Sequence, residues 1–226
     1  MNKTKIEWVR NPDGTQGYSW NPIKGICPVG CWYCYARTMY KRFHMKETLE
    51  FYVTRGDIAQ MDRIPPSCIF ICSTIEIFHP RIKKLWRDRI FYTIGQFPKH
   101  TFIVLTKMPE NIDRPMPDNV WLGVSITGEG QDMSRWLDLE KATARVKFIS
   151  FEPILTPIVF EADHCPDIPN WTIWGRLTGY GKKRAAFDRR ILFDGVDFFK
   201  KAGSKVFIKN NLREIWGEPL IQEFPK

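Results

Sequence analysis

Hydrophobic and polar positions along the chain follow two periods in turn, which predicts a protein built from alternating strands and helices. Short apolar runs bounded by turn residues are typical of strands buried on both faces. Apolar residues three or four positions apart are typical of amphipathic helices. The predicted strands cover residues 18–23, 68–73, 101–106, 120–126, 146–151, 171–175 and 205–209, and the predicted helices cover residues 35–46, 79–97, 133–143 and 189–202.

Strands that alternate with helices imply a parallel sheet covered by helices. The pattern contains six or seven strand–helix units in 226 residues. A closed eight-unit barrel averages about 250 residues, so an incomplete barrel fits the length better. The sequence therefore predicts an α/β protein, a partial (βα)6 TIM-like barrel, with one domain over residues 1–226.

Three cysteines lie close together just after the first predicted strand. Cys27, Cys31 and Cys34 have the spacing C-x-x-x-C-x-x-C, and Tyr33 precedes the last of them. Three thiolates on one loop can hold three corners of a [4Fe–4S] cluster and leave the fourth iron open. A structural zinc site is the main alternative, with His44 as the nearest fourth ligand. Accidental clustering and a disulfide framework are weaker alternatives, because disulfide frameworks suit short secreted chains.

Polar residues follow most of the predicted strands. In parallel α/β folds, functional residues gather at the carboxyl ends of the strands, so we expect these residues to form one site. Each of them alone could equally be a strand-end cap or part of a loop salt bridge. The candidates are Ser73, Glu76, Ser125, Ser150, Glu152 and Arg176.

The formal net charge of +9 indicates an anionic partner. Residues 182–213 contain ten Lys or Arg against three Asp, and the chain has nine Trp. Basic residues and aromatic residues that the core does not need occur together in grooves that bind nucleic-acid strands. A run of basic residues is nevertheless more often an ordinary solvated surface. No known nucleic-acid module is visible. We predict nucleic-acid contacts at Lys182, Lys183, Arg184, Arg189, Arg190 and Lys209.

Compartment and membrane contact follow from composition. No apolar run approaches eighteen residues and the first ten residues are polar, so neither a membrane span nor a signal peptide is expected. The other cysteines, Cys68, Cys72 and Cys165, are predicted to be structural, with Cys68 and Cys72 on one face of a strand. A reducing cytoplasm is expected, because an exposed cluster and free thiols would not persist in an oxidising compartment.

The cysteine segment resembles the motif of the radical S-adenosylmethionine (SAM) superfamily. Further stretches, such as STIEIFHP, NVWLGVSI, RVKFISFEPIL and KVFIKNN, resemble a phage-associated radical-SAM-like family of unassigned function. The resemblance implies a partial (βα)6 barrel, a [4Fe–4S] cluster, SAM bound to its open iron, and cleavage of SAM to a 5′-deoxyadenosyl radical. It also implies that Tyr33 packs on the SAM adenine, that strand-end residues bind SAM, and that flavodoxin or ferredoxin supplies the electron.

These observations together favour a radical SAM enzyme that acts on a nucleic acid, with DNA preferred, as a repair lyase or a base-modifying enzyme. Arg176 replaces an acidic residue that is usual in the resembled family, and an arginine suits a phosphate or carboxylate. Two alternatives remain open. One is a non-enzymatic nucleic-acid-binding protein with a structural metal, and the other is a radical SAM enzyme that acts on a small anionic metabolite.

Overall fold

The computed structural model describes residues 1–130, 132–158, 167–178 and 188–225. Within these ranges an eight-stranded sheet has the order β1-β2-β5-β6-β7-β8-β9-β10. All neighbouring pairs are parallel except β1 with β2. The strands are β1 (Asn2–Lys3), β2 (Tyr18–Trp20), β5 (Cys68–Ile71), β6 (Thr101–Thr106), β7 (Val120–Ser125), β8 (Val146–Ile154), β9 (Trp171–Arg176) and β10 (Lys205–Ile208).

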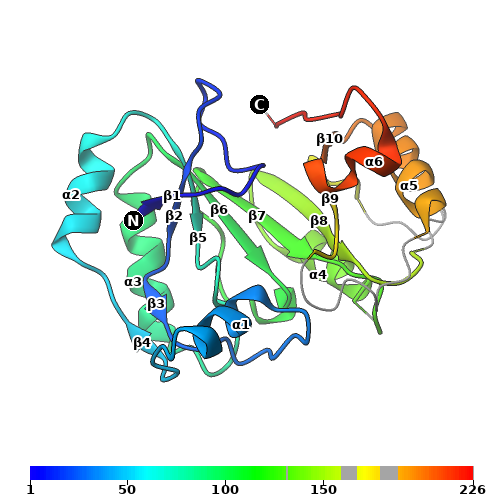
Figure 1. The fold of residues 1–226 in the computed structure, drawn as a ribbon. Coiled ribbons are helices and arrows are strands. Elements are labelled where there is room, and N and C mark those ends of the chain that lie inside the picture. Colours follow the sequence, from blue (N-terminus) through cyan, green and yellow to red (C-terminus); the bar gives the residue numbers. More distant parts are fainter. Residues whose placement is uncertain (131, 159–166, 179–187, 226) are drawn as a thin grey trace.

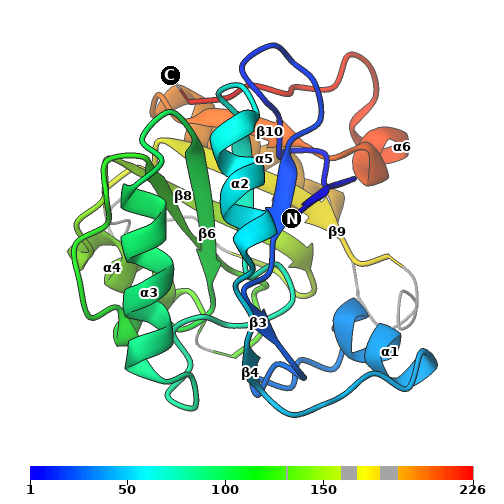
Figure 2. The same ribbon diagram turned by 90° about the vertical axis from the view of Figure 1, so that its left-hand side faces the viewer.

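Helices connect the strands and cover one face of the sheet (Figures 1 and 2). They are α1 (Tyr35–Arg42), α2 (Arg55–Arg63), α3 (Lys84–Gly95), α4 (Ser134–Lys141), α5 (Arg189–Lys201) and α6 (Arg213–Trp216), with 3-10 turns η1 (Pro109–Asn111) and η4 (Asn210–Leu212). A small antiparallel pair, β3 (Ile23–Lys24) and β4 (Glu50–Phe51), flanks α1 in the chain. Helix α2 begins at a capping box, in which the Thr54 and Asp57 side chains each accept from the other's backbone N–H.

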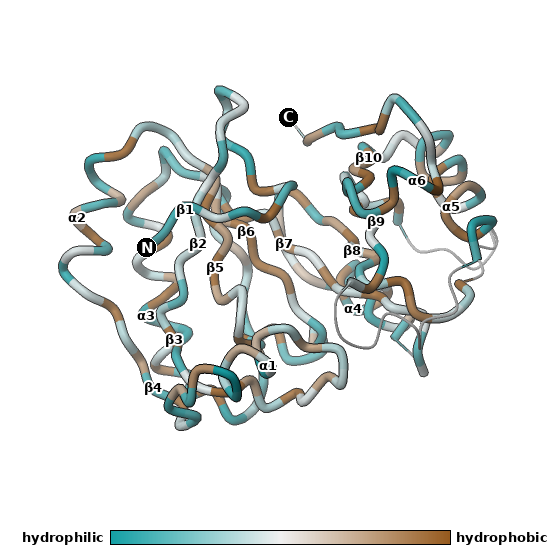
Figure 3. Tube along the Cα trace, in the orientation of Figure 1, coloured by the Kyte–Doolittle hydropathy of each residue, from teal (hydrophilic) through white to brown (hydrophobic). Residues whose placement is uncertain are grey.

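Alternate residues of each strand belong to two different cores, because successive side chains in a strand point to opposite faces. On β6, Phe102 and Val104 pack in the core that includes residues of α3, α4 and α5. Ile103 belongs to the opposite core, where Phe148 and Trp171 pack against Trp8 of the N-terminal segment. The hydrophobic stretches of the strands are visible in Figure 3. The sheet is therefore buried on both faces.

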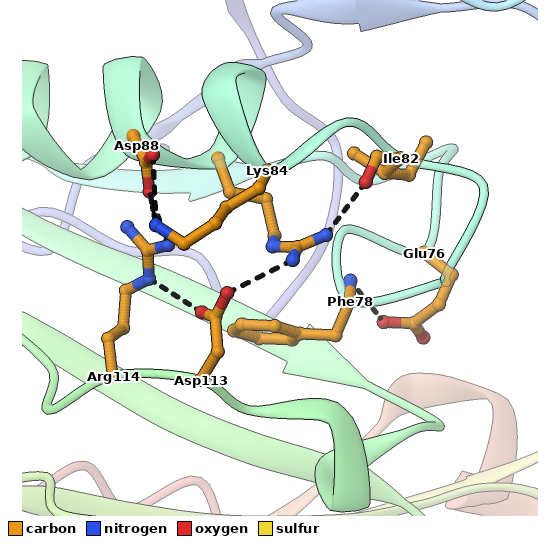
Figure 4. A network of polar contacts seen from close by, with 8 residues as sticks. Glu76, Phe78, Ile82, Lys84, Asp88, Asp113 and Arg114 are labelled. Carbon is orange, nitrogen blue, oxygen red and sulfur yellow. Dashed lines mark hydrogen bonds and ion pairs between the residues drawn. The ribbon is translucent and has the colours of Figure 1, made fainter.

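A network of ion pairs attaches α3 to the segment that precedes β7 (Figure 4). Asp113 accepts from Arg114 Nε at 2.8 Å and from Arg87 Nη2 at 3.0 Å. Arg114 also pairs with Asp88 of α3, and Asp88 pairs with Lys84 one turn earlier. The network holds α3 in place on the side of the sheet that lies away from Trp8.

The α/β class and the mostly parallel sheet predicted from the sequence are confirmed. Strand β6 has the predicted bounds, and most other predicted strands and helices occur with shifted ends. Helix α1 ends at Arg42 and not at residue 46, because His44 adopts a left-handed backbone with φ of 48°. The short β1, β3 and β4 and helix α2 were not predicted. The described strands form an open sheet with β1 and β10 at its edges, and no closed barrel is present among them.

The expectation that Cys68 and Cys72 share one face of a strand is wrong. Strand β5 ends at Ile71, and Cys72 has a positive φ of 51°, which turns the chain out of the strand. The two buried thiols consequently lie in different cores. Cys165 lies outside the described residues. Among the described helices, none is long and apolar enough to span a membrane.

Candidate functional site

The face of the sheet that packs against Trp8 is called the inner face here. It becomes polar toward the carboxyl ends of the strands. Residues two positions apart share a face, so each inward-facing series can be followed to its end. On β8 the series runs from Phe148 through Ser150 to Glu152, and Lys209 follows Phe207 at the end of β10. The inner face is therefore apolar along the strands and carries charged and hydroxyl groups at their carboxyl ends.

A cavity of about 390 Å³ lies at this polar edge. Its volume is within the range of about 300–1,000 Å³ that is usual for small-molecule sites. All three loop cysteines line it, together with Tyr33 and every strand-end residue predicted from the sequence, namely Ser73, Glu76, Ser125, Ser150, Glu152 and Arg176. The structure therefore brings these candidates together, and their roles in binding remain predictions.

Local contacts fix the cysteine loop against the cavity wall. The Cys27 thiol accepts a hydrogen bond from the Glu76 backbone N–H at 3.4 Å, and burial raises the pKa of that thiol. Arg37 Nη2 donates to the Cys27 carbonyl at 3.0 Å. Cys34 is the residue that begins α1, and its N–H donates to the Cys31 carbonyl at 3.2 Å. These contacts join the loop to α1 on one side and to the end of β5 on the other.

The three thiols do not form a metal site as they are placed. Over the described ranges, no group of three or more His, Cys, Asp or Glu side chains is arranged to hold a metal ion. The Cys27 thiol accepts from the Glu76 N–H, whereas Cys31 is close enough to Tyr33 to raise the pKa of that phenol. The cysteine spacing predicted a gathered set of ligands, which the described residues do not form.

The Tyr33 ring forms part of the cavity wall beside the cysteines. Burial and the neighbouring Cys31 raise the pKa of Tyr33 far above its ordinary value, so this phenol stays protonated. The ring contacts Trp32 edge-on with centroids 5.5 Å apart, and Lys107 Nζ lies 5.9 Å from the ring centroid. Trp32 and Lys107 therefore orient the Tyr33 ring, which is the ring predicted to pack on an adenine.

Glu76 is almost fully buried and its carboxylate is already engaged by the protein. Oε1 accepts from Thr106 Oγ1 at 2.6 Å and from the Phe78 N–H at 3.1 Å, and Oε2 accepts from the Lys107 N–H at 2.7 Å. Burial raises the pKa of Glu76, while these hydrogen bonds oppose that effect. The carboxylate consequently joins the ends of β5 and β6, which is the strand-end role left open as an alternative for each of these residues.

Lys107 is a cavity residue that was not among the predicted site residues. Burial lowers the pKa of its ammonium group, and the nearby Cys31 and Glu76 act in the opposite direction. Its position follows the same two-residue rule, because it comes two residues after the inward-facing Leu105. This alternation along the strand can be read from the sequence, and it places Lys107 at the cavity as a basic group beside the cysteine loop.

The part of the cavity wall formed by β8, β9 and β10 carries an ion pair between Glu152 and Lys209. Gly175 of β9 leaves room for it, since a Cβ there would approach Lys209 Cδ to 3.0 Å and Glu152 Cδ to 3.1 Å. Next to it, Arg176 Nη2 lies 3.3 Å from Glu214 Oε2. Lys209, predicted as a nucleic-acid contact, lines the cavity, and its contact with nucleic acid stays a prediction.

Three polar atoms of cavity-lining residues are buried without a hydrogen-bond partner among the described residues. They are Ser150 Oγ, Trp8 Nε1 and Arg176 Nε. A buried polar group without a partner is costly, typically by about 1–3 kcal/mol. Such groups beside a cavity are available to a ligand once it binds. Trp8 was missed by the sequence analysis because nothing in the local pattern connects the N-terminal segment to the strand ends.

Two other predicted nucleic-acid contacts, Arg189 and Arg190, do not line the cavity. Arg190 pairs with Asp188 at 3.1 Å where α5 begins, and the Arg189 guanidinium lies 5.4 Å from the Phe193 ring centroid. Lys182, Lys183 and Arg184 fall outside the described residues.

Fold and site define an α/β protein in which the carboxyl edge of a parallel sheet forms a cysteine-lined cavity. Residues 3–191 match the model of a family described as "Protein of unknown function (DUF5131)", and the chain belongs to that family. No curated protein matches the chain. No solved structure matches it either.

The assignment to the radical SAM superfamily is wrong. The matching family is one of unknown function, and no radical SAM family was found. Over the described ranges the three cysteines also do not form the gathered ligand set that the superfamily motif implies. Their short spacing along the chain suggested a cluster, but spacing alone does not fix the directions of the side chains.

Proposed function

We propose that this chain is an enzyme that holds a [4Fe–4S] cluster at Cys27, Cys31 and Cys34, binds SAM in the cavity and acts on a nucleic acid. We rest this on the chemistry of the site and not on membership of a superfamily. The observation that carries it is that all three thiols line one cavity with a buried Ser150 hydroxyl that has no hydrogen-bond partner among the described residues. Together the cluster and SAM would supply a 5′-deoxyadenosyl radical for hydrogen abstraction.

The donor set fits a cluster that leaves one iron without a protein ligand, because three thiols are available on one loop. To act as ligands, the three thiols must turn toward a shared centre, since they are not gathered as the described residues stand. The Glu76 N–H would still be able to donate to the Cys27 sulfur, and such hydrogen bonds tune cluster potentials. The present partner of Cys27 therefore becomes a supporting contact.

The rest of the cavity supplies groups that complement SAM. Glu152 is a carboxylate that suits an ammonium group, and Lys107 is a cation that suits a carboxylate. The Tyr33 ring provides a flat apolar face for adenine, and the Ser150 hydroxyl can satisfy one further polar atom. The other predicted contacts are Ser73, Glu76, Ser125 and Arg176.

A nucleic acid is the proposed substrate because the net charge is +9. We propose further that the open sheet is a partial (βα)6 barrel, whose mouth would accept a substrate larger than the cavity, with DNA repair or base modification as the outcome. The cytoplasm and an electron donor such as flavodoxin or ferredoxin belong to the same proposal, since the cluster needs a reducing compartment.

The decisive assay is anaerobic reconstitution followed by reductant and SAM, with 5′-deoxyadenosine as the measured product. Cys31→Ala should abolish the product, whereas Cys68→Ala, which removes a thiol in the inner core away from the cavity wall, should retain it. Formation of the product equally by the wild type and by Cys31→Ala would contradict the proposal. A colourless zinc protein without product would instead support a non-enzymatic, metal-stabilised protein.

A small anionic metabolite is a second candidate substrate, favoured by the presence of Lys107, Arg176 and Lys209 in one cavity. The two substrates are distinguished by salt. Affinity for a nucleic acid falls steeply with ionic strength, because phosphate contacts release counterions. A protein that makes 5′-deoxyadenosine but has no salt-dependent affinity for nucleic acid would favour the metabolite.

A further inference from the structure

The segment around α1 is basic and carries no acidic residue. From Gly14 to Lys46 the sequence contains five Lys or Arg and no Asp or Glu. Residues 41–46, the first two of which end α1, are all exposed. Figure 1 shows α1 at the carboxyl ends of the strands, where the cavity lies. This part of the surface therefore offers positive charge close to the cavity.

Large aromatic side chains are exposed along the same segment. Tyr35 is 63% exposed, Phe43 is 62% exposed and Trp32 is 41% exposed. Tyr35 and Phe43 stand at opposite ends of α1, which as an eight-residue helix is about 12 Å long. We call Trp32, Tyr35, Lys41, Arg42 and Phe43 the α1 surface. Aromatic faces interleaved with cations are the elements of single-strand binding grooves.

The α1 surface is continuous with the cavity. Tyr35 lines the cavity, and its hydroxyl donates to the Ser73 carbonyl at 3.2 Å, which fixes the ring at the mouth. Trp32 packs edge-on against Tyr33 of the cavity wall. Its indole N–H is held 3.3 Å from both carboxylate oxygens of Glu129. Two aromatic residues at the mouth are thus oriented before any substrate arrives.

The cations of the α1 surface are free to bind phosphate. No carboxylate in the part of the chain that the structure describes forms an ion pair with Lys41 or Arg42. The Arg42 guanidinium instead lies 5.4 Å from the Phe43 ring centroid. On α3, Lys84 pairs with Asp88 and the half-buried Arg87 pairs with Asp113, which leaves Arg89 as an exposed cation there. The α1 surface differs from α3 because it lies next to the cavity, and this favours it for an anionic partner that must reach the cavity.

We propose that the α1 surface binds single-stranded nucleic acid, with bases stacked on Phe43 and Tyr35, and leads one base toward the cavity. This inference rests on the proposed function for the chemistry in the cavity. A single strand is favoured over a duplex because exposed aromatic faces need unstacked bases, and enzymes that modify a base take it out of the helix. Arg42 and Lys41 would contact the flanking phosphates.

The test measures binding of labelled single-stranded DNA and RNA oligonucleotides, and of the matching DNA duplex, by fluorescence anisotropy at several salt concentrations. Arg42→Ala combined with Phe43→Ala should weaken single-strand affinity by about tenfold or more and reduce the salt dependence. Both side chains are exposed, so the fold should persist, which circular dichroism checks. Arg89→Ala combined with Tyr92→Ala is the matched control, since it removes an exposed cation and an exposed aromatic from α3.

Each result separates this inference from the proposed chemistry. Weaker binding only in the α1 variant supports the α1 surface. Equal affinities of the α1 variant and the control would overturn it and leave the nucleic-acid substrate in place. Tighter binding of the duplex than of the single strand would also overturn it. Absence of any nucleic-acid binding at low salt would overturn both the surface and the nucleic-acid substrate, while formation of 5′-deoxyadenosine would still report on the cluster and SAM.

Discussion

Glu152 and Lys209 form an ion pair that crosses β9 at the position of Gly175. The pair links the ends of β8 and β10, two strands that are not neighbours in the sheet. A Cβ at Gly175 would approach both partners to 3.0–3.1 Å, so a larger residue there would require the Glu152 or Lys209 side chain to shift. This part of the cavity wall is thus built from three adjacent strands together.

Replacing this glycine should disturb the ion pair and the cavity. We expect Gly175→Ala to lower the free energy of unfolding by about 1–3 kcal/mol, the usual cost of forcing an extra group into a packed site. Ligand affinity should fall as well, because Glu152 and Lys209 must move. Gly95→Ala is the control, since a Cβ at Gly95 meets nothing within 4 Å and should be neutral or slightly stabilising. Urea unfolding of the two variants measures the difference, and equal stabilities would contradict the packing argument.

The unpartnered hydroxyl of Ser150 predicts opposite effects on stability and binding. Ser150→Ala removes a buried polar group without a partner, so the unfolding free energy should stay the same or rise by about 1 kcal/mol. Affinity for SAM, measured by calorimetry on the reconstituted protein, should fall several-fold, as expected for one lost hydrogen bond. Ser67→Ala should instead destabilise, because Ser67 Oγ donates to the Pro65 carbonyl at 2.7 Å. A loss of stability in Ser150→Ala would show that the hydroxyl has a partner in the protein.

The network around Asp113 predicts a stability that depends on acidity. Arg114, and then Arg87, lower the pKa of Asp113 from 3.8 to about 2. A depressed pKa means that the ionised carboxylate stabilises the fold at neutral pH, and that this contribution is lost as the pH falls from about 4 to about 2. Because Asp113 is partly exposed, we expect Asp113→Asn to cost only about 1 kcal/mol at pH 7.

The measurement for Asp113 is urea unfolding at pH 7 and at intervals down to pH 2. The stabilities of the wild type and of Asp113→Asn should converge as the pH falls. Asp118→Asn, which changes an exposed carboxylate a few residues further along, controls for loss of negative charge. A difference between wild type and Asp113→Asn that does not change with pH would contradict the assigned cause.

Periodicity was sufficient to predict the sheet and much of the cavity. The inward-facing series on β8 can be read directly from the sequence, and it identifies Ser150 and Glu152 at its polar end. The rule that functional groups gather at the carboxyl ends of parallel strands then gave the correct neighbours, because β5 to β10 are all parallel. These inferences needed only local pattern and one general property of the fold.

Two features were beyond such reasoning because they depend on tertiary contacts. Trp8 reaches the cavity from the N-terminal segment, which has no periodic pattern to place it. The Cys27 thiol accepts from the Glu76 N–H, a partner that motif spacing does not predict. Lys209, by contrast, follows Phe207 by two residues at the end of β10, so the strand register places it at the polar edge, and only its ion pair with Glu152 across β9 needed the structure.

The most direct test of the central claim is the iron and sulfide content of protein reconstituted without oxygen. The wild type and Cys68→Ala should each bind about four iron and four sulfide ions per chain with broad visible absorbance, and Cys31→Ala should lose them. That result would establish Cys27, Cys31 and Cys34 as cluster ligands, although they are not gathered as the described residues stand. Iron and sulfide retained in full by Cys31→Ala, or a wild type that takes up zinc and no sulfide, would contradict the account.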